Sequence, residues 1–208
     1  MPRPRRQPTE HVVVELPKLT KGLPPPPPAS LDPFLDAAAG CFARYGIRRT
    51  SVQDVADALR INRTTVYRQV VNVESMVRML SAREMHRLLT TLGPRASSGF
   101  TPDDVVELLA TAVEYARGHP VVAKVVVDEP ELLGRALNDV PEVLGRAATV
   151  IAPLLDSAMR AGQLARRDPV VVAEWLSRIG VTVILAPPPG DLRAFLREVL
   201  VPALEVNR

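Results

Sequence analysis

The chain has 208 residues, of which 47% are hydrophobic and 4% aromatic, so its core must be built mainly from Val, Leu, Ala and Ile. Its single cysteine, Cys41, excludes an intrachain disulfide and favours a reducing compartment. The sequence contains neither an apolar run of about 18 residues, as a membrane-spanning helix needs, nor the apolar segment of a signal peptide after its basic N-terminus. We therefore expect a cytoplasmic protein without a membrane partner.

The net charge of +3 is unevenly distributed along the chain. Residues 1–92 carry fourteen Lys or Arg against eight Asp or Glu, whereas residues 93–208 carry twelve against fifteen. This asymmetry is typical of a protein whose front part binds a polyanion. An offset of a few charges also arises by chance, so the asymmetry alone decides nothing.

Residues 1–29 have the composition of a tail rather than of a folded unit. Five consecutive prolines at positions 24–28 favour a stiff polyproline II spacer, and we expect the residues before them to be disordered or loosely packed. An alternative is that Arg3, Arg5 and Arg6 form a basic arm that reaches DNA.

The first predicted helix lies in the segment LDPFLDAAAGCFARYG. Asp32 before Pro33 has the pattern of an N-cap followed by a first-turn proline, and Gly46 is a typical C-cap. The apolar face expected for this helix consists of Phe34, Ala38, Cys41, Phe42 and Tyr45.

Two short helices joined by a turn are predicted next. Ser51 and Asp54 have the spacing of a capping box, with Asp in place of the usual Glu, and Asn62 can cap the second short helix, NRTTVYRQV. The turn between them falls at Arg60 and Ile61. The residues expected to face inward are Val52, Val55, Ala56, Leu59, Ile61, Val66 and Val70. Two short helices and a tight turn after a supporting helix predict a helix-turn-helix.

The outward face of the second short helix has side chains suited to DNA. Arginine binds guanine or phosphate, threonine contacts a base or a thymine methyl group, and tyrosine donates to phosphate. For an isolated segment an ordinary solvated helix face is the better interpretation, and the three-helix context shifts the balance. The residues of this face are Arg63, Thr64, Thr65, Tyr67 and Arg68, and none of them is acidic.

The rest of the chain also has helical patterns, and no strand is predicted. A fourth helix is expected to start near position 73 and to end at Gly93 and Pro94. Further helices are predicted over 102–118, from 120 to a break at 130, over 141–162, from 169 to before the prolines at 187–189, and over 191–206. The predicted fold is all-α, with an N-terminal three-helix unit and a larger helical C-terminal domain.

Residues 31 to about 90 resemble the DNA-binding domain of TetR-family transcriptional regulators. The resemblance rests on FLDAAAGCFARYGIRRTSVQDVADALRINRTTVYRQVVNVESMVRML, which has a helix ending in glycine, a Thr-Ser pair, an apolar stripe, a turn, and a helix ending Thr-apolar-Tyr-x-x-apolar. The match runs without gaps over about sixty residues. It implies a helix-turn-helix domain over 30–90, with the motif itself at 51–70, after the extension 1–29.

By this resemblance, Thr50 or Ser51 and Tyr67 bind phosphate, while the remaining outward residues of the second short helix face bases and backbone. Three positions depart from the family pattern. The turn glycine is Arg60, the histidine after the tyrosine is Gln69, and a lysine that follows the helix is Val73. These departures put one phosphate contact in doubt, and the basic tail is a candidate replacement.

For residues 91–208 the resemblance implies a domain that binds a ligand and dimerises through its last two helices. Both helices are apolar on more than one face, which favours burial in a homodimer, with a monomeric core as the alternative. The interface residues expected from this pattern are Trp175, Ile179, Val183, Phe195 and Val199. The candidate pocket residues are Met79, Met85, Tyr115, Met159 and Trp175, although each is also a plausible core residue.

Enzymatic functions have little support in the sequence. His11, His86 and His119 lack the spacing of a metal site, and no glycine-rich phosphate loop occurs, so we expect no cofactor. We expect a homodimeric repressor that binds a palindromic double-stranded DNA operator and is released by a small hydrophobic effector. The alternatives are a structural DNA-binding protein without sequence preference and a ligand-binding scaffold that no longer binds DNA.

Overall fold

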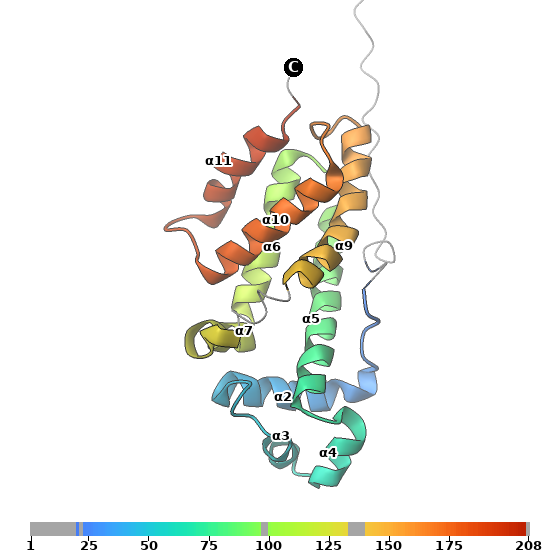
Figure 1. Cartoon of the computed structure of the whole chain (residues 1–208), viewed down its shortest axis with the longest axis vertical. Helices are drawn as coiled ribbons and strands as arrows, with labels where there is room; N and C mark the ends of the chain where they lie inside the picture. Colours follow the sequence, from blue (N-terminus) through green and yellow to red (C-terminus); the bar gives the residue numbers. More distant parts are fainter. Residues whose placement is uncertain (1–19, 21–22, 97–99, 133–139, 207–208) are drawn as a thin grey trace, which may run out of the picture.

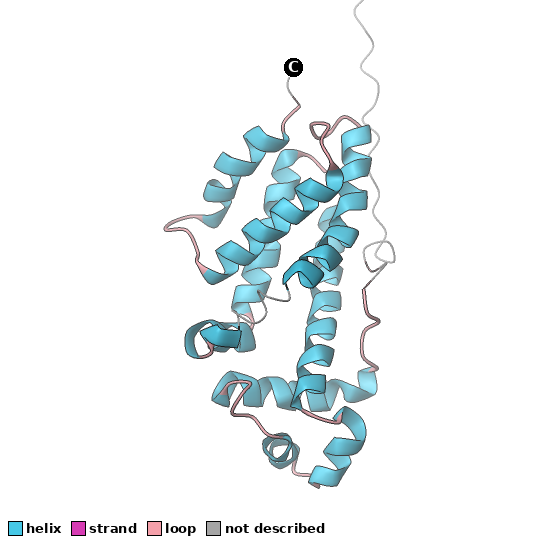
Figure 2. Ribbon diagram, in the orientation of Figure 1, coloured by secondary structure: helices cyan, strands magenta, loops and turns pink. Residues whose placement is uncertain are grey.

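The computed structural model describes residues 20, 23–96, 100–132 and 140–206, and all regular elements in these ranges are helices (Figures 1 and 2). The all-α prediction is therefore confirmed. No helix within the described ranges is long and apolar enough to cross a membrane. The helices form a small lower unit and a larger upper unit, and one long helix extends from the first into the second (Figure 1).

The lower unit, called the head below, contains the predicted helix-turn-helix. After a 3₁₀ turn, η1 (Ala29–Leu31), it consists of α2 (Asp32–Tyr45), α3 (Val52–Leu59), α4 (Arg63–Val70) and the first turns of α5 (Val73–Ala96). Its core includes buried Leu35, Phe42, Val55, Val66 and Met76. Burial also raises the pKa of the Cys41 thiol, as expected for a core cysteine rather than a nucleophile.

The helix boundaries in the head follow local sequence signals, with one exception. Ser51 and Asp54 form the predicted capping box, the Asn62 side chain accepts the Thr64 N–H, and Gly46 ends α2 at φ 88°. Asp32 was expected to cap α2, but it is the first helical residue and its side chain makes no cap hydrogen bond.

Asp32 instead takes part in an ion-pair cluster that joins α2 to α5. The nearly buried Arg83 guanidinium lies 3.0 Å from Asp32 Oδ1, 2.8 Å from Asp36 Oδ1 and 3.1 Å from Glu84 Oε1. A tertiary contact 51 residues away in sequence therefore determines the role of Asp32, which the local N-cap pattern does not indicate.

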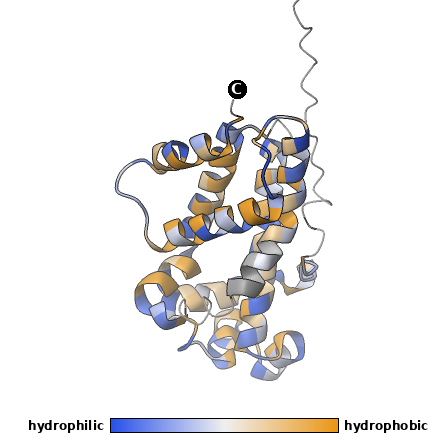
Figure 3. Cartoon of the chain, turned by 45° about the horizontal axis from the view of Figure 1, so that its top comes forward, coloured by the Kyte–Doolittle hydropathy of each residue, from blue (hydrophilic) through white to orange (hydrophobic). Residues whose placement is uncertain are grey.

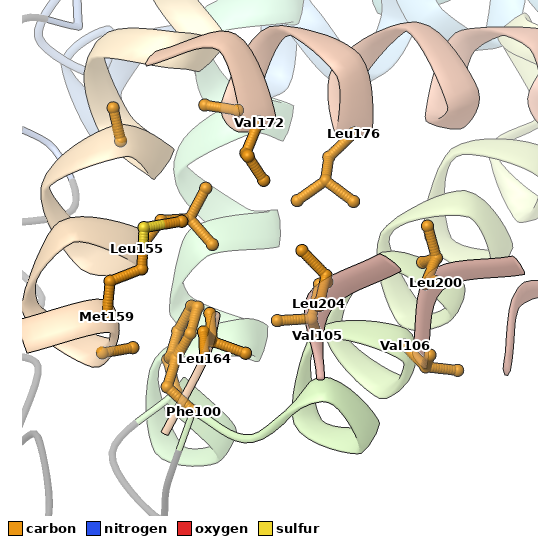
Figure 4. Close-up of a cluster of buried hydrophobic side chains, with 14 of the residues drawn as sticks. Phe100, Val105, Val106, Leu155, Met159, Leu164, Val172, Leu176, Leu200 and Leu204 are labelled. Atoms are coloured by element: carbon orange, nitrogen blue, oxygen red, sulfur yellow. The ribbon is translucent and has the colours of Figure 1, made fainter. Parts of the chain in front are cut away.

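Four helices of the upper unit pack around a second core (Figures 3 and 4), to which the end of α5 also contributes, whereas the fifth, α7 (Pro120–Asp128), packs against the head core. The four are α6 (Pro102–Gly118), α9 (Val140–Arg160), α10 (Pro169–Leu185) and α11 (Leu192–Leu204). The Thr101, Asp168 and Asp191 side chains cap α6, α10 and α11, so the predicted helix starts are confirmed.

Helix α5 does not end where the sequence indicates. It runs through Gly93 and Pro94 to Ala96, because Leu89, Gly93 and Ala96 are buried while Pro94 is exposed on the opposite side. Proline removes one backbone hydrogen bond, and we infer that burial of these neighbours in the upper core offsets that loss. The extension allows α5 to contribute to both cores.

The polyproline segment lies beside α5 (Figure 1). Leu23 packs against the upper core, the Pro24 carbonyl lies 2.8 Å from His86 Nε2, and Pro28 has polyproline II dihedrals of φ −54° and ψ 141°. The expected disorder before the prolines and the proposed basic arm at Arg3, Arg5 and Arg6 lie outside the described residues.

Candidate nucleic-acid interface

The turn between α3 and α4 has a left-handed backbone conformation at Arg60. Glycine, which the family resemblance leads one to expect at this position, favours that conformation. Arg60 has φ 55° and ψ 41°, its N–H donates to Asp57 O at 3.1 Å, and the Ile61 N–H donates to Ala56 O at 3.0 Å. An L-residue in this region costs roughly 1 kcal/mol relative to glycine. The turn thus keeps its hydrogen bonds despite the unfavourable residue.

Four of the predicted outward residues of α4 are exposed, namely Arg63, Thr64, Tyr67 and Arg68, and Thr65 is half-buried. The inward residues Val66 and Val70 are completely buried in the head core. Ile61, however, is exposed, so its predicted inward placement is wrong. As part of the turn, it lies outside the helical periodicity used to place it.

Two of the outward side chains contact each other. The Arg63 guanidinium stacks over the Tyr67 ring, with Cζ 5.0 Å from the ring centroid, and Nη2 donates to Tyr67 Oη at 2.6 Å. These residues are one helical turn apart, so the cation and the phenol are presented together.

Thr50 and Ser51, at the start of α3, differ in their accessibility. Thr50 is buried, and its hydroxyl donates to Gly46 O at 2.7 Å. Ser51 is exposed, and its hydrogen bonds to Asp54 lower the pKa of that carboxyl group. Of the pair suggested by the family resemblance, Ser51 is the one whose side chain can be reached from solvent.

Sequence reasoning missed the strained connection after α4. Val71 has φ 52° and ψ −60°, and the Asn72 N–H donates to Val70 O at 2.6 Å, which makes a γ-turn. The Asn72 side chain then accepts the Ser75 N–H at 2.7 Å in the first turn of α5. A β-branched residue is unfavourable at positive φ, so this joint between α4 and α5 stores strain.

An apolar cavity of about 140 Å³ lies in the upper unit between α5, α6, α9 and α10. Its only polar lining residue among the described ones is Ser177, whose hydroxyl donates to Ala173 O at 2.8 Å. The lining residues are Leu89, Leu92, Ala96, Phe100, Val105, Leu108, Leu109, Ala112, Val150, Ile151, Leu154, Leu155, Leu176 and Ser177. Figure 4 shows several of these within the surrounding core.

None of the five candidate pocket residues lines this cavity. Met79 packs against the head core, Met85 is exposed, and Met159 and Trp175 belong to or pack against the upper core. Tyr115 donates its hydroxyl to Glu84 Oε2 at 2.9 Å, and burial, together with this carboxylate, raises its pKa to about 12. The cavity is lined instead mostly by aliphatic residues, whose types alone do not distinguish a pocket from a core.

The expected interface residues fall into two groups. Phe195 and Val199 are 44% and 45% exposed on the outer side of α11, next to the face that carries buried Leu196 and Leu200. Val183 is buried within this chain, so its side chain is not accessible at the surface, and Trp175 and Ile179 are half-buried.

Residues 34–71 match the family model of bacterial regulatory proteins of the tetR family. This segment is therefore a DNA-binding domain of the TetR family. The chain is thus a DNA-binding transcriptional regulator, as expected, and regulators of this family are not enzymes. The matched segment includes α3 and α4.

Solved structures support the fold over most of the chain. One, described as the molecular basis for control of antibiotic production by bacterial hormones, is 27% identical, with a TM-score of 0.64 over 84% of this chain and 97% of that chain. The SmeT–triclosan complex is 18% identical, with a TM-score of 0.64 over 86% and 93%. FadR of Bacillus halodurans, a fatty acid degradation regulator, is 19% identical, with a TM-score of 0.62 over 82% and 92%. No curated protein matches the chain.

Proposed function

We propose that this regulator is a homodimeric repressor that binds a palindromic operator and releases it when a small hydrophobic molecule enters the upper cavity. Residues 30–90 would form the DNA-binding head, and residues 91–208 the domain for effector binding and dimerisation. The observation that carries the proposal is the exposed face of α4, where Arg63 and Tyr67 are held together above a fully buried Val66.

The DNA contacts proposed are Ser51, Arg63, Thr64, Thr65, Tyr67 and Arg68. Arg63 and Arg68 supply charge for phosphate or guanine, and the threonines supply short hydroxyl groups for base edges or backbone. Thr50 would act indirectly, because its hydroxyl is used to hold Gly46 at the end of α2.

Dimerisation is supported by the apolar stripe on α11. Phe195 and Val199 are exposed although they are large and apolar, exposed Pro202 lies on the same side of the helix, and exposed Val206 follows its end. Burial of such a stripe against a second copy removes apolar surface from water. Two copies are also needed to place two heads in successive major grooves, roughly 34 Å apart.

The size of the cavity supports induction by a wedge-like ligand. A cavity of about 140 Å³ accommodates a benzene-sized molecule, whereas typical small-molecule pockets have volumes of about 300 Å³ or more. A larger apolar ligand must push the surrounding helices apart and would therefore bind the displaced state better than the present one. That difference in affinity is what a ligand needs to shift an equilibrium.

Helix α5 is suited to transmit such a displacement. Leu89, Leu92 and Ala96 line the cavity, while Met76 and Leu80 near the other end of α5 belong to the head core. A shift of α5 would change the orientation of the head and thus the spacing between two heads. The solved SmeT–triclosan complex has the same fold with a small molecule bound, and the proposal extends a hydrophobic effector to this chain.

Selection of random duplex DNA on the purified protein at about 150 mM salt tests the proposal. An enriched palindrome is the expected result. Retention of DNA without a motif would favour structural DNA binding, since phosphate contacts alone do not depend on sequence. No retention would favour a ligand-binding scaffold and count against the proposal.

A further inference from the structure

One buried carboxylate from the C-terminal half of the chain binds a loop of the head. Glu129 follows α7 and is only 3% exposed. Its Oε2 accepts the Ile47 N–H at 2.7 Å, and its Oε1 accepts the Arg48 N–H at 2.9 Å. Both donors belong to the loop between α2 and α3, more than 80 residues away in sequence. Both carboxylate oxygens are therefore used to fix this loop.

The loop is shaped to receive this carboxylate. A Cβ atom on Gly46 would lie 2.9 Å from both Cδ and Oε1 of Glu129, a distance too short for ordinary contact. Gly46 also has φ 88°, so its lack of a side chain serves both the end of α2 and the approach of Glu129.

Glu129 is itself fixed at a rigid corner. Its N–H donates to Val125 O at 3.1 Å, and its carbonyl accepts the Leu132 N–H at 2.9 Å. Val121 and Val125 of α7 are buried in the head core, so α7 packs as part of the head although it follows α6 in the chain. Helix α6 contributes Val105, Leu108, Leu109 and Ala112 to the cavity wall.

We propose that Glu129 is a positioning residue for DNA binding. Its carboxylate sets the orientation of the α2–α3 loop, and through it of α3 and α4, relative to the upper unit. The inference rests on the proposed operator binding of the head. Glu129 gives the upper unit a second connection to the head besides α5. A displacement of α6 would be transmitted through α7 and Glu129 to the two backbone N–H groups of the loop. A purely stabilising role for Glu129 is the alternative that the experiment must separate.

The experiment uses the full chain with spin labels at two exposed alanines, Ala58 on α3 and Ala161 after α9, each replaced by cysteine. The native Cys41 is buried. Labelled protein diluted with unlabelled protein reports the intramolecular distance between head and upper unit. The test variants are Glu129→Ala and the isosteric Glu129→Gln, which keeps one acceptor in case the alanine variant fails to fold.

Glu131→Gln is the matched control, because it replaces an exposed carboxylate at the same corner, which forms an ion pair of 2.6 Å with Arg48. We expect the Glu129 variants to broaden the label distance distribution and to weaken binding of the selected operator roughly tenfold, whereas the control changes neither. Lower thermal stability with an unchanged distance distribution and unchanged operator affinity would overturn the proposal.

The distance measurement separates this inference from the proposed function. If the native protein selects no operator, the proposed function fails, but the width of the distance distribution still tests whether Glu129 orients the head. If the native protein selects an operator and the Glu129 variants bind it with native affinity and a narrow distance distribution, only the positioning role fails.

Discussion

Arg63 donates from Nη2 to Tyr67 Oη at 2.6 Å while its guanidinium covers the Tyr67 ring. Since the phenol oxygen accepts this hydrogen bond, the phenol hydrogen stays available to donate to a phosphate oxygen. The contact also restricts two long side chains on the exposed side of α4, which reduces the entropy lost when they bind DNA. The two residues are therefore expected to act together.

A double-mutant cycle of Arg63→Ala and Tyr67→Phe on the selected operator tests this relationship. Tyr67→Phe should weaken all DNA sequences about equally, whereas Arg63→Ala should relax one base position by ~1–3 kcal/mol if it contacts a base. Because the residues touch, the two effects should not add. Titrations against the operator and its single-base variants measure both terms. Arg78→Ala, an equal charge change on α5, should have a smaller effect, and strict additivity would argue against coupling.

The cavity predicts binding of a small apolar probe. Benzene should raise the unfolding temperature of the native protein, because a ligand that binds only the folded state stabilises it. Ala112→Leu fills part of the cavity and should abolish this shift while operator binding remains. Ala123→Leu, on the exposed side of α7, is the matched control and should respond like the native protein. A shift that persists in Ala112→Leu would place the benzene site elsewhere.

The apolar stripe on α11 predicts the oligomeric state. Replacing Phe195 and Val199 together by glutamate should give a monomer with weaker operator binding, since charged groups cannot be buried unpaired in an interface. Light scattering after size-exclusion chromatography gives the mass. Val127→Glu removes an exposed valine on α7 and should leave the mass unchanged. A double variant with native mass would mean that the interface lies on another face.

The parts of the structure that could be predicted from sequence depend on local interactions. The caps at Ser51, Asn62, Thr101 and Asp191 need only neighbouring backbone groups, so residue type and spacing are sufficient to find them. The exposed face of α4 follows from helical periodicity because its buried side is strictly apolar. The sequence left open whether the turn without its usual glycine keeps its geometry, and Arg60 adopts the left-handed conformation.

The failures concern contacts between distant parts of the chain. Asp32 has the pattern of an N-cap, but Arg83 engages it from α5, and Pro94 does not end a helix whose neighbouring residues are buried in the upper core. The contacts of Glu129 with the α2–α3 loop span more than 80 residues, and no local pattern indicates them. The cavity could not be predicted from the sequence, because its mostly aliphatic lining has the same composition as a packed core.

The strained γ-turn at Val71 predicts that a substitution by glycine increases the stability of the protein. Val71 is 63% exposed, so its side chain contributes little packing, whereas its backbone at φ 52° carries a cost of about 1–3 kcal/mol. Val71→Gly should relieve this strain, and the greater freedom of glycine in the unfolded chain should cancel about 0.5–1 kcal/mol of the gain. The net expectation is an increase of about 1 kcal/mol in the free energy of unfolding. Urea denaturation at an unchanged m-value measures this difference.

Val71→Ala is the control for the γ-turn, because alanine removes the branched side chain but keeps the Cβ atom that disfavours positive φ. It should recover less stability than glycine does. If glycine instead lowers the free energy of unfolding as much as it does within an ordinary helix, the turn stores no strain. Glycine also gives the joint between α4 and α5 more backbone freedom, so Val71→Gly should also alter how far the head follows a displacement of α5.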